Sequence, residues 1–84
     1  MRVKIYYFAS LRETLGVSSE TVELPTEVTS LAALREHLAA RGEPWSALVT
    51  TRNLRAAVNQ QMVGFEAALK AEDEVAFFPP VTGG

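Results

Sequence analysis

The absence of cysteine from a chain of 84 residues is the feature that most restricts how this protein can fold. Without a thiol, the chain cannot form a disulfide scaffold, a zinc ribbon or an iron–sulfur site, and it has no cysteine nucleophile. Its length suits one domain, because a second hydrophobic core would not fit. Since 48% of the residues are hydrophobic and 21% are charged, the composition is globular. We therefore expect one domain that is too small to enclose a large cofactor.

The charge balance and the N-terminus argue against two classes of partner. Eight basic and ten acidic residues give a formal net charge of −2, and the basic residues are scattered. A nucleic-acid-binding protein needs a basic face, so we expect no nucleic-acid partner. No apolar run approaches the ~20 residues of a membrane span, and the N-terminus enters an alternating segment and not a signal-peptide core. We expect a cytoplasmic protein with no membrane partner.

Residue periodicity predicts five short strands and a helix between the first two. The strands are expected at 2–8, 19–24, 55–59, 61–65 and 74–78. Ser10 and Glu13 have the spacing of a capping box, which predicts a short helix over 10–15 that Gly16 ends. The first two strands are therefore expected to pair as neighbours joined by a helical turn.

The main helix is expected over about 30–41. Thr29 or Ser30 is expected to cap it, and Gly42 is expected to end it. Leucines at helical spacing form one apolar stripe, and charged residues occupy the opposite face. The stripe contains Leu31, Leu34 and Leu38, and the charged face contains Arg35, Glu36 and Arg41.

This order of elements predicts an α+β fold, with one main helix packed across a mixed sheet. The first and last strands are rich in apolar and aromatic residues, so we expect them to be central and parallel. The stretch 43–54 has no clear pattern, although Trp45 and Leu48 are expected to cover the end of the core.

Strand alternation also assigns the two faces of the central strands. The core face under the helix is expected to hold Val3, Ile5, Tyr7, Val75 and Phe77. Phe8 and Phe78 then point to the other face, where Met62 is expected to join them. Large apolar groups on an exposed sheet face predict an interaction patch.

The side chains of the domain do not compose an ordinary active site. His37 has no second histidine or cysteine with which to bind a metal, so we expect an ordinary surface residue. The acidic run 72–74 could be a metal site or an acid–base pair, but it is more typical of a solvated turn. Ser18 and Ser19 are expected in a turn, and no glycine-rich loop could hold a phosphate. We expect no metal site and no independent active site in this chain.

The C-terminal residues are the strongest functional signal. Pro79 and Pro80 cannot continue a central strand, so the domain is expected to span 1–78 and an extended, flexible tail to span 79–84. The tail ends in Val81, Thr82, Gly83 and Gly84 and can reach roughly 20 Å. Two terminal glycines make a slim tip that can enter a narrow tunnel. Because a carboxylate is inert to substitution until it is activated, we expect another enzyme to activate it.

The chain resembles the ubiquitin-like β-grasp proteins, and within them the small subunits of molybdopterin synthase (the MoaD family). The resemblance covers the whole chain, including its length. Its matching segments are 3–9 (Val-Lys-Ile-Tyr-Tyr-Phe-Ala), 11–13 (Leu-Arg-Glu), 57–60 (Ala-Val-Asn-Gln) and 74–84 (Glu-Val-Ala-Phe-Phe-Pro-Pro-Val-Thr-Gly-Gly). The last of these is the most specific, whereas 43–54 adds little.

The resemblance implies a sulfur carrier. An adenylyltransferase related to ubiquitin-activating enzymes would use ATP to adenylate the carboxylate of Gly84, and sulfur would then replace AMP to give a thiocarboxylate. The tail, with Gly83 providing access, would enter the large subunit and donate sulfur to cyclic pyranopterin monophosphate. The implied assembly is a heterotetramer of two small subunits on a large-subunit dimer. The expected partner-binding residues are the outer-face side chains assigned by strand alternation together with the tail: Phe8, Met62, Phe78, Pro79, Pro80, Val81 and Thr82.

Two other interpretations of the sequence stay open. The chain could be a sulfur carrier for thiamine or for transfer-RNA thiolation, or a ubiquitin-like modifier joined to lysines through Gly84. It could also be a passive β-grasp binding module without covalent chemistry. The length and the Phe-Phe-Pro-Pro segment favour the molybdopterin interpretation, in which this chain binds no cofactor and ATP serves only the activating enzyme.

Overall fold

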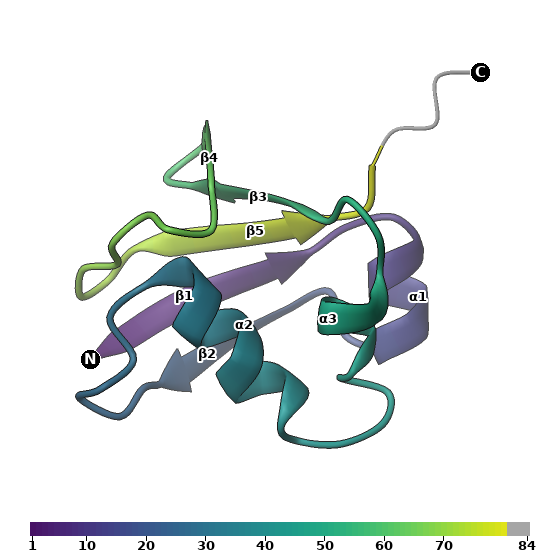
Figure 1. Cartoon of the computed structure of the whole chain (residues 1–84), viewed down its shortest axis with the longest axis horizontal. Helices are drawn as coiled ribbons and strands as arrows, with labels where there is room; N and C mark the ends of the chain where they lie inside the picture. The colour runs from purple at the N-terminus through teal and green to yellow at the C-terminus, as the bar shows by residue number, and fades with distance from the viewer. Residues whose placement is uncertain (81–84) are drawn as a thin grey trace.

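The computed structural model describes residues 1–80 (Figure 1). Five strands and three helices make up this part of the chain. In chain order they are β1 (Arg2–Tyr7), α1 (Ser10–Leu15), β2 (Ser19–Glu23), α2 (Leu31–Ala39), α3 (Ala47–Thr50), β3 (Arg55–Val58), β4 (Gln61–Val63) and β5 (Glu74–Phe78). All five predicted strands and both predicted helices are present, and α3 is the element that the sequence did not indicate.

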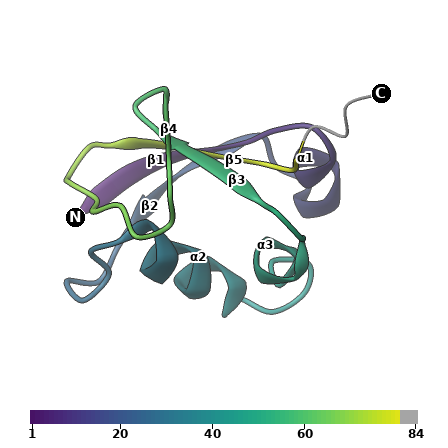
Figure 2. The ribbon, with the colours of Figure 1, turned by 45° about the horizontal axis from the view of Figure 1, so that its top comes forward.

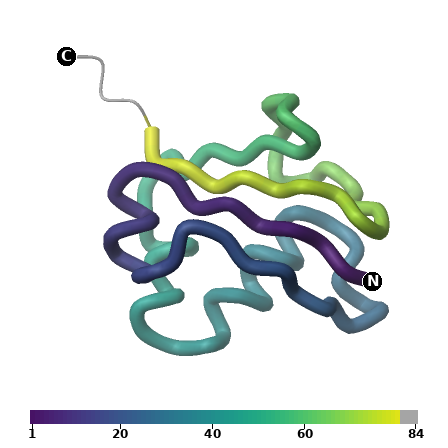
Figure 3. The backbone as a smooth tube through the Cα atoms, turned by 180° about the vertical axis from the view of Figure 1, so that it is seen from behind, coloured from purple at the N-terminus to yellow at the C-terminus, as the bar shows by residue number. Residues whose placement is uncertain are grey.

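The strands form one mixed sheet in the order β2-β1-β5-β3-β4. β1 and β5 are parallel, and the other neighbours are antiparallel. Figure 3 shows the purple β1 and the yellow β5 side by side through the middle of the sheet. Figure 2 shows α2 and α3 below one face, so the other face is left without a helical cover. The predicted α+β class, the central parallel pair and the pairing of the first two strands are confirmed.

The core lies between the sheet and α2. The inward-facing side chains of β1 and β5 are Val3, Ile5, Tyr7, Val75 and Phe77, and each is at most 1% exposed. The three leucines of the predicted helical stripe are fully buried against them. Because burying one such side chain contributes about 1.5–3 kcal/mol, this layer supplies much of the stability of the domain. The predicted assignment of the two strand faces is therefore correct.

The helix ends differ partly from expectation. Ser30 caps α2, because its Oγ accepts a hydrogen bond from the Ala33 N–H at 3.1 Å. Gly16 ends α1 in the left-handed conformation, with φ of 79°. The predicted cap of α1 is wrong: Ser10 lies in its first turn, and Ala9 holds the cap position with φ of 55° and no side-chain cap bond. The helix itself spans Ser10–Leu15, as predicted, so only the cap position differs, and it lies at Ala9.

The stretch 43–54 closes one end of the core. Leu48 of α3 is fully buried and Trp45 packs against the core, as predicted. Two arginines expected on a charged helix face bind this region instead. Arg35 Nε donates to the Leu48 carbonyl at 2.6 Å, and the Arg41 guanidinium lies over the Trp45 ring at 4.4 Å.

The acidic run before β5 is only partly solvated. Asp73 is 6% exposed, so the expectation of a solvated turn is wrong for this residue. Its carboxylate accepts hydrogen bonds from Asn59 Nδ2 at 2.9 Å and from the Lys70 N–H at 2.8 Å. Buried charges are retained in proteins when they are bonded in this way. Asp73 is therefore a structural residue that joins the β3–β4 turn to the start of β5.

Candidate functional site

The candidate site is the place where β5 ends and the chain leaves the sheet. β5 is flanked by β1 and β3, and its last residue, Phe78, lies opposite Arg55 of β3. The Phe8 N–H donates to the Phe77 carbonyl at 3.1 Å, which holds the end of β1 against the end of β5. Pro79 and Pro80 follow outside the strand, as predicted, and both are half-buried. The tail therefore starts from the middle of a rigid sheet.

The remaining tail residues fall beyond the part of the chain that the structure describes. The predicted docking segment and reactive end consist of Val81, Thr82, Gly83 and Gly84. All four lie outside the described residues. Their proposed roles rest on the sequence and on the position of Pro80.

The uncovered sheet face carries the predicted apolar side chains. Phe8 is 46% exposed and Met62 is 57% exposed, and Phe78 is half-buried. We call Phe8, Phe78, Met62 and the additional Tyr6 the outer-face patch. The Tyr6 and Phe8 rings stack with centroids 6.4 Å apart. Tyr6 was missed as a partner-binding candidate, although it shares the strand parity of Phe8.

Strand register divides the outer-face patch into two sides. Tyr6 lies opposite Ala76, Ala76 lies opposite Ala57, and Ala57 lies opposite Met62. Two alanines thus separate Met62 from the aromatic pair, across about 14 Å of sheet at the usual strand spacing. Met62 is on the predicted face but is not in the same cluster as Phe8. Small residues between large ones leave a hollow and not a flat apolar surface.

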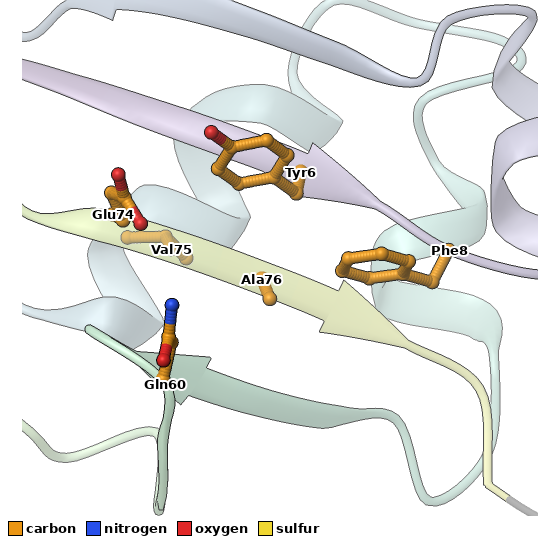
Figure 4. Close-up of a pocket in the computed structure, with 6 residues that line it drawn as sticks. All are labelled: Tyr6, Phe8, Gln60, Glu74, Val75 and Ala76. Carbon is orange, nitrogen blue, oxygen red and sulfur yellow. The ribbon is translucent and has the colours of Figure 1, made fainter.

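The hollow lies above β5 and has a volume of about 390 Å³. Figure 4 shows Ala76 at its centre, Tyr6 and Phe8 on the β1 side, and Glu74 and Gln60 at the end far from Phe8. The residues that line it are Tyr6, Phe8, Gln60, Glu74, Val75 and Ala76. Gln60 comes from the β3–β4 turn, where Asn59 and Gln60 both have positive φ. Such a hollow can receive one side chain of a partner protein.

The titratable groups do not form an acid–base pair at this site. Burial, reinforced by the hydrogen bond to Glu20, raises the pKa of Tyr7 well above its usual range. The neutral Tyr7 hydroxyl donates to Glu20 Oε2 at 2.8 Å, and Arg41 binds the same carboxylate. His37 lies on α2, behind the sheet from the outer face. Among residues 1–80, no group of three or more histidines and acidic residues could hold a metal ion.

No helix within the described range 1–80 has the length and apolar character needed to span a membrane.

Comparisons with known proteins find relatives along the full chain. The model of the ThiS family matches residues 5–84. The molybdopterin synthase sulfur carrier subunit of Escherichia coli is 43% identical over 98% of this chain and 99% of its own length. The corresponding subunit of Haemophilus influenzae is 40% identical over the same shares of the two chains.

Solved structures share the architecture. A Pyrococcus furiosus structure, titled as a candidate molybdopterin converting factor, subunit 1, has a TM-score of 0.80 and 31% identity, over 96% of this chain and 99% of that one. Small archaeal modifier protein 1 of Haloferax volcanii has a TM-score of 0.78 at 23% identity, over 100% of both chains, and supports the fold alone. The ubiquitin-like β-grasp fold is therefore confirmed.

Proposed function

This chain belongs to the ThiS family, as a relative of the sulfur carrier subunits of molybdopterin synthase, and from that membership we propose that it carries sulfur on its C-terminus. One observation gives the main support for this proposal. A central strand ends at Phe78 beside the exposed ring of Phe8, and a Pro-Pro segment and two terminal glycines follow it in the sequence. A rigid sheet thereby provides the docking surface, and the tail provides the reaching group.

The reactive group in this proposal is the carboxylate of Gly84. In the first step, an adenylyltransferase joins this carboxylate to the α-phosphate of ATP and releases pyrophosphate. A sulfur nucleophile then attacks the acyl carbon, AMP leaves with its electron pair, and Gly84 keeps the sulfur as a thiocarboxylate. Activation of this kind is needed because a free carboxylate is a poor acceptor for nucleophiles. This chain binds no cofactor itself, and the ATP belongs to the activating enzyme.

The proposed acceptor is cyclic pyranopterin monophosphate in a pocket of the large subunit. The sulfur of the Gly84 thiocarboxylate bonds to a carbon of the acceptor, and an oxygen substituent leaves that carbon. Water then cleaves the acyl–sulfur bond, so that the sulfur stays on the acceptor and Gly84 returns to a carboxylate. Two such transfers supply the two sulfurs of the dithiolene. The absence of an acid–base pair from the described outer face supports a division of labour, in which the large subunit supplies the pocket. The chain is then the small subunit of the enzyme and has no active site of its own. Two copies on a large-subunit dimer would form the heterotetramer.

The outer-face patch is the proposed docking surface for both partner enzymes. Aromatic and methionine side chains are enriched in protein interfaces, and Phe8 and Met62 are exposed here. A related structure fits this proposal, because it is a protein–protein complex of subunits 1 and 2 of molybdopterin-converting factor from Helicobacter pylori. At 22% identity that structure supports the fold of this chain, and the partner remains our proposal.

Intact mass after coexpression with the activating enzyme tests the proposal. The C-terminal peptide should gain about 16 Da when sulfur replaces oxygen, and a thiol-reactive alkylator should separate this product from methionine sulfoxide. A chain lacking Gly84 is the control and should not gain the alkylatable mass. An unmodified terminus with ATP and a sulfur source present would contradict sulfur carriage.

The products that the thiocarboxylated chain forms distinguish the alternative pathways. The molybdopterin proposal expects the thiocarboxylated chain to form dithiolene when the large subunit and the acceptor are added. Covalent conjugates between Gly84 and lysines, in place of dithiolene, would indicate a protein modifier. A thiocarboxylate that reacts only in thiamine synthesis or transfer-RNA thiolation would indicate another sulfur-transfer pathway.

A further inference from the structure

We propose that the hollow above Ala76 receives one long cationic side chain, an arginine or a lysine, from the large subunit. The inference rests on the proposed function and adds the chemistry by which the partner recognises this face. It places a charged contact inside the apolar patch, between Phe8 and the start of β5.

The hollow is large enough to admit one extended side chain. Its volume is about 390 Å³, far above the ~10–15 Å³ that a single water needs on the same measure. Ala76 forms the floor at the centre of the hollow (Figure 4). Any larger residue at this position would fill the space, because the outer-facing side chain of Ala76 points into it. The half-buried state of Ala76 agrees with a floor that a partner can still reach.

The lining changes from aromatic to polar along the hollow. Tyr6 and Phe8 present stacked rings near the end of β5, and Glu74 presents its carboxylate and Gln60 its side-chain amide at the other end. An aliphatic stem can lie on the rings while a cationic head reaches the carboxylate, as long basic side chains do elsewhere. A guanidinium or ammonium group is also attracted by the face of an aromatic ring.

The charge state of Glu74 supports a cation in particular. Its two acidic neighbours are occupied: Glu72 pairs with Arg2 at 3.4 Å, and Asp73 accepts bonds from Asn59 and Lys70. Within residues 1–80, the Glu74 carboxylate has no ion pair or hydrogen bond, and it is exposed. Lys4 is its neighbour in register, but the Lys4 ammonium lies 5.7 Å from the centroid of the Tyr6 ring. The carboxylate is therefore available to a partner.

Other occupants fit less well. A purely apolar side chain would cover Glu74 and Gln60 without giving them a hydrogen-bond partner, and unpaired buried polar groups are costly. An acidic side chain would be repelled by Glu74 and by the overall charge of −2. A lysine or arginine side chain can pack its aliphatic stem on the aromatic rings and pair its charged head with the Glu74 carboxylate.

Calorimetric titration of the full chain into the large subunit of the same organism tests the inference. Ala76→Met fills the hollow and should weaken binding by more than about tenfold, as for the centre of an interface. Glu74→Gln removes the charge with little change in shape and should weaken binding by about fivefold at low salt. That fivefold difference should shrink toward one at an ionic strength of about 0.5 M, because salt screens the ion pair.

Glu72→Gln is the matched control, because it removes a neighbouring charge outside the hollow, and its affinity should stay at the wild-type value. Circular dichroism melts establish that each variant is folded, and if Ala76→Met does not fold, Glu74→Gln decides. Wild-type affinity for both hollow variants would overturn the inference. A loss with Ala76→Met but none with Glu74→Gln would show an apolar occupant and would also overturn it. If the wild-type chain does not bind, the proposed function itself fails.

Discussion

Two neighbouring residues of β5 have different expected roles, one in folding and one in binding. Phe77 is fully buried in the core, whereas its neighbour Phe78 lies half-buried on the face that no helix covers. The two side chains have the same chemistry and differ only in the direction that strand alternation gives them. Substituting each of them therefore tests a different property.

Phe77→Asp should unfold the domain, because it places an unpaired carboxylate in the core. Phe78→Asp should leave the domain folded and weaken binding to the large subunit by about 2 kcal/mol, the effect of losing an interface anchor. Thermal melts and calorimetric titration measure the two effects. A folded Phe77→Asp chain, or a Phe78→Asp chain that binds normally, would contradict the assignment of the two faces.

The free energy of unfolding of the domain should depend on pH through Tyr7. Its pKa is raised in the folded chain, chiefly by burial, whereas in the unfolded chain it ionises near the usual value of about 10. Above that pH the unfolded chain holds fewer protons than the folded chain. The stabilisation from Tyr7 is thus complete below pH 10, and the free energy of unfolding should fall by about 1.4 kcal/mol per pH unit above it.

Urea unfolding of the wild-type chain, Tyr7→Phe and Tyr6→Phe measures this slope. The measurements should run from about pH 8 to about pH 11.5, a range that brackets the usual tyrosine pKa. Tyr7→Phe should lose about 1–2 kcal/mol at neutral pH with its hydrogen bond to Glu20, and should have a flatter alkaline limb. Tyr6→Phe is the matched control, since it removes a tyrosine hydroxyl that lies outside the core. Equal slopes in all three proteins would refute the role of Tyr7.

At the scale of elements, β5 passes directly from a central strand into Pro79 and Pro80. A strand with neighbours on both sides is rigid, and two prolines restrict the backbone where it leaves the sheet. The direction in which the chain starts toward a partner is therefore set before binding. Asp73 and Asn59 secure the other end of β5 through their hydrogen bond.

Replacing Pro79 and Pro80 with glycine should weaken docking to the large subunit by about 1 kcal/mol per residue, because more backbone entropy is lost on binding. The melting temperature should change little, since both residues lie outside the strand. Pro25→Gly, in the loop after β2, is the control and should bind normally. Unchanged affinity of the double variant would mean that the prolines only end β5.

At the scale of the whole molecule, the proposed docking surface and the proposed reacting atom belong to different parts of the chain. The outer-face patch and the hollow belong to the sheet, whereas the carboxylate of Gly84 lies six residues beyond Phe78 in the sequence. Binding and sulfur transfer should then be separable by changing the length of the chain.

Deleting Gly84 moves the carboxylate back by about 3.5 Å. Displacing a reacting group by even 1 Å can cost on the order of 10²-fold in rate, so dithiolene formation should be lost. Adding one residue after Gly84 should be equally damaging. Thermal stability and affinity for the large subunit should stay close to wild type in both cases. Dithiolene formation by the shortened chain would refute the sulfur-carrier proposal.

The sequence by itself determined the features that depend on near neighbours in the chain. Strand alternation assigned Phe77 and Phe78 to opposite faces, and the leucine spacing of α2 marked its buried stripe. The end of β5 followed from Pro79, since a proline cannot donate a strand hydrogen bond. These properties are set by backbone geometry within a few residues, so they can be predicted without a structure.

Tertiary structure alone decided the features that depend on distant segments meeting. The hollow exists because register places Tyr6 beside Ala76, seventy positions later, and because the β3–β4 turn brings Gln60 beside them. Asp73 is buried because Asn59 reaches it from another strand pair. No local pattern reports either event, because burial and contact depend on how strands far apart in sequence align within one sheet.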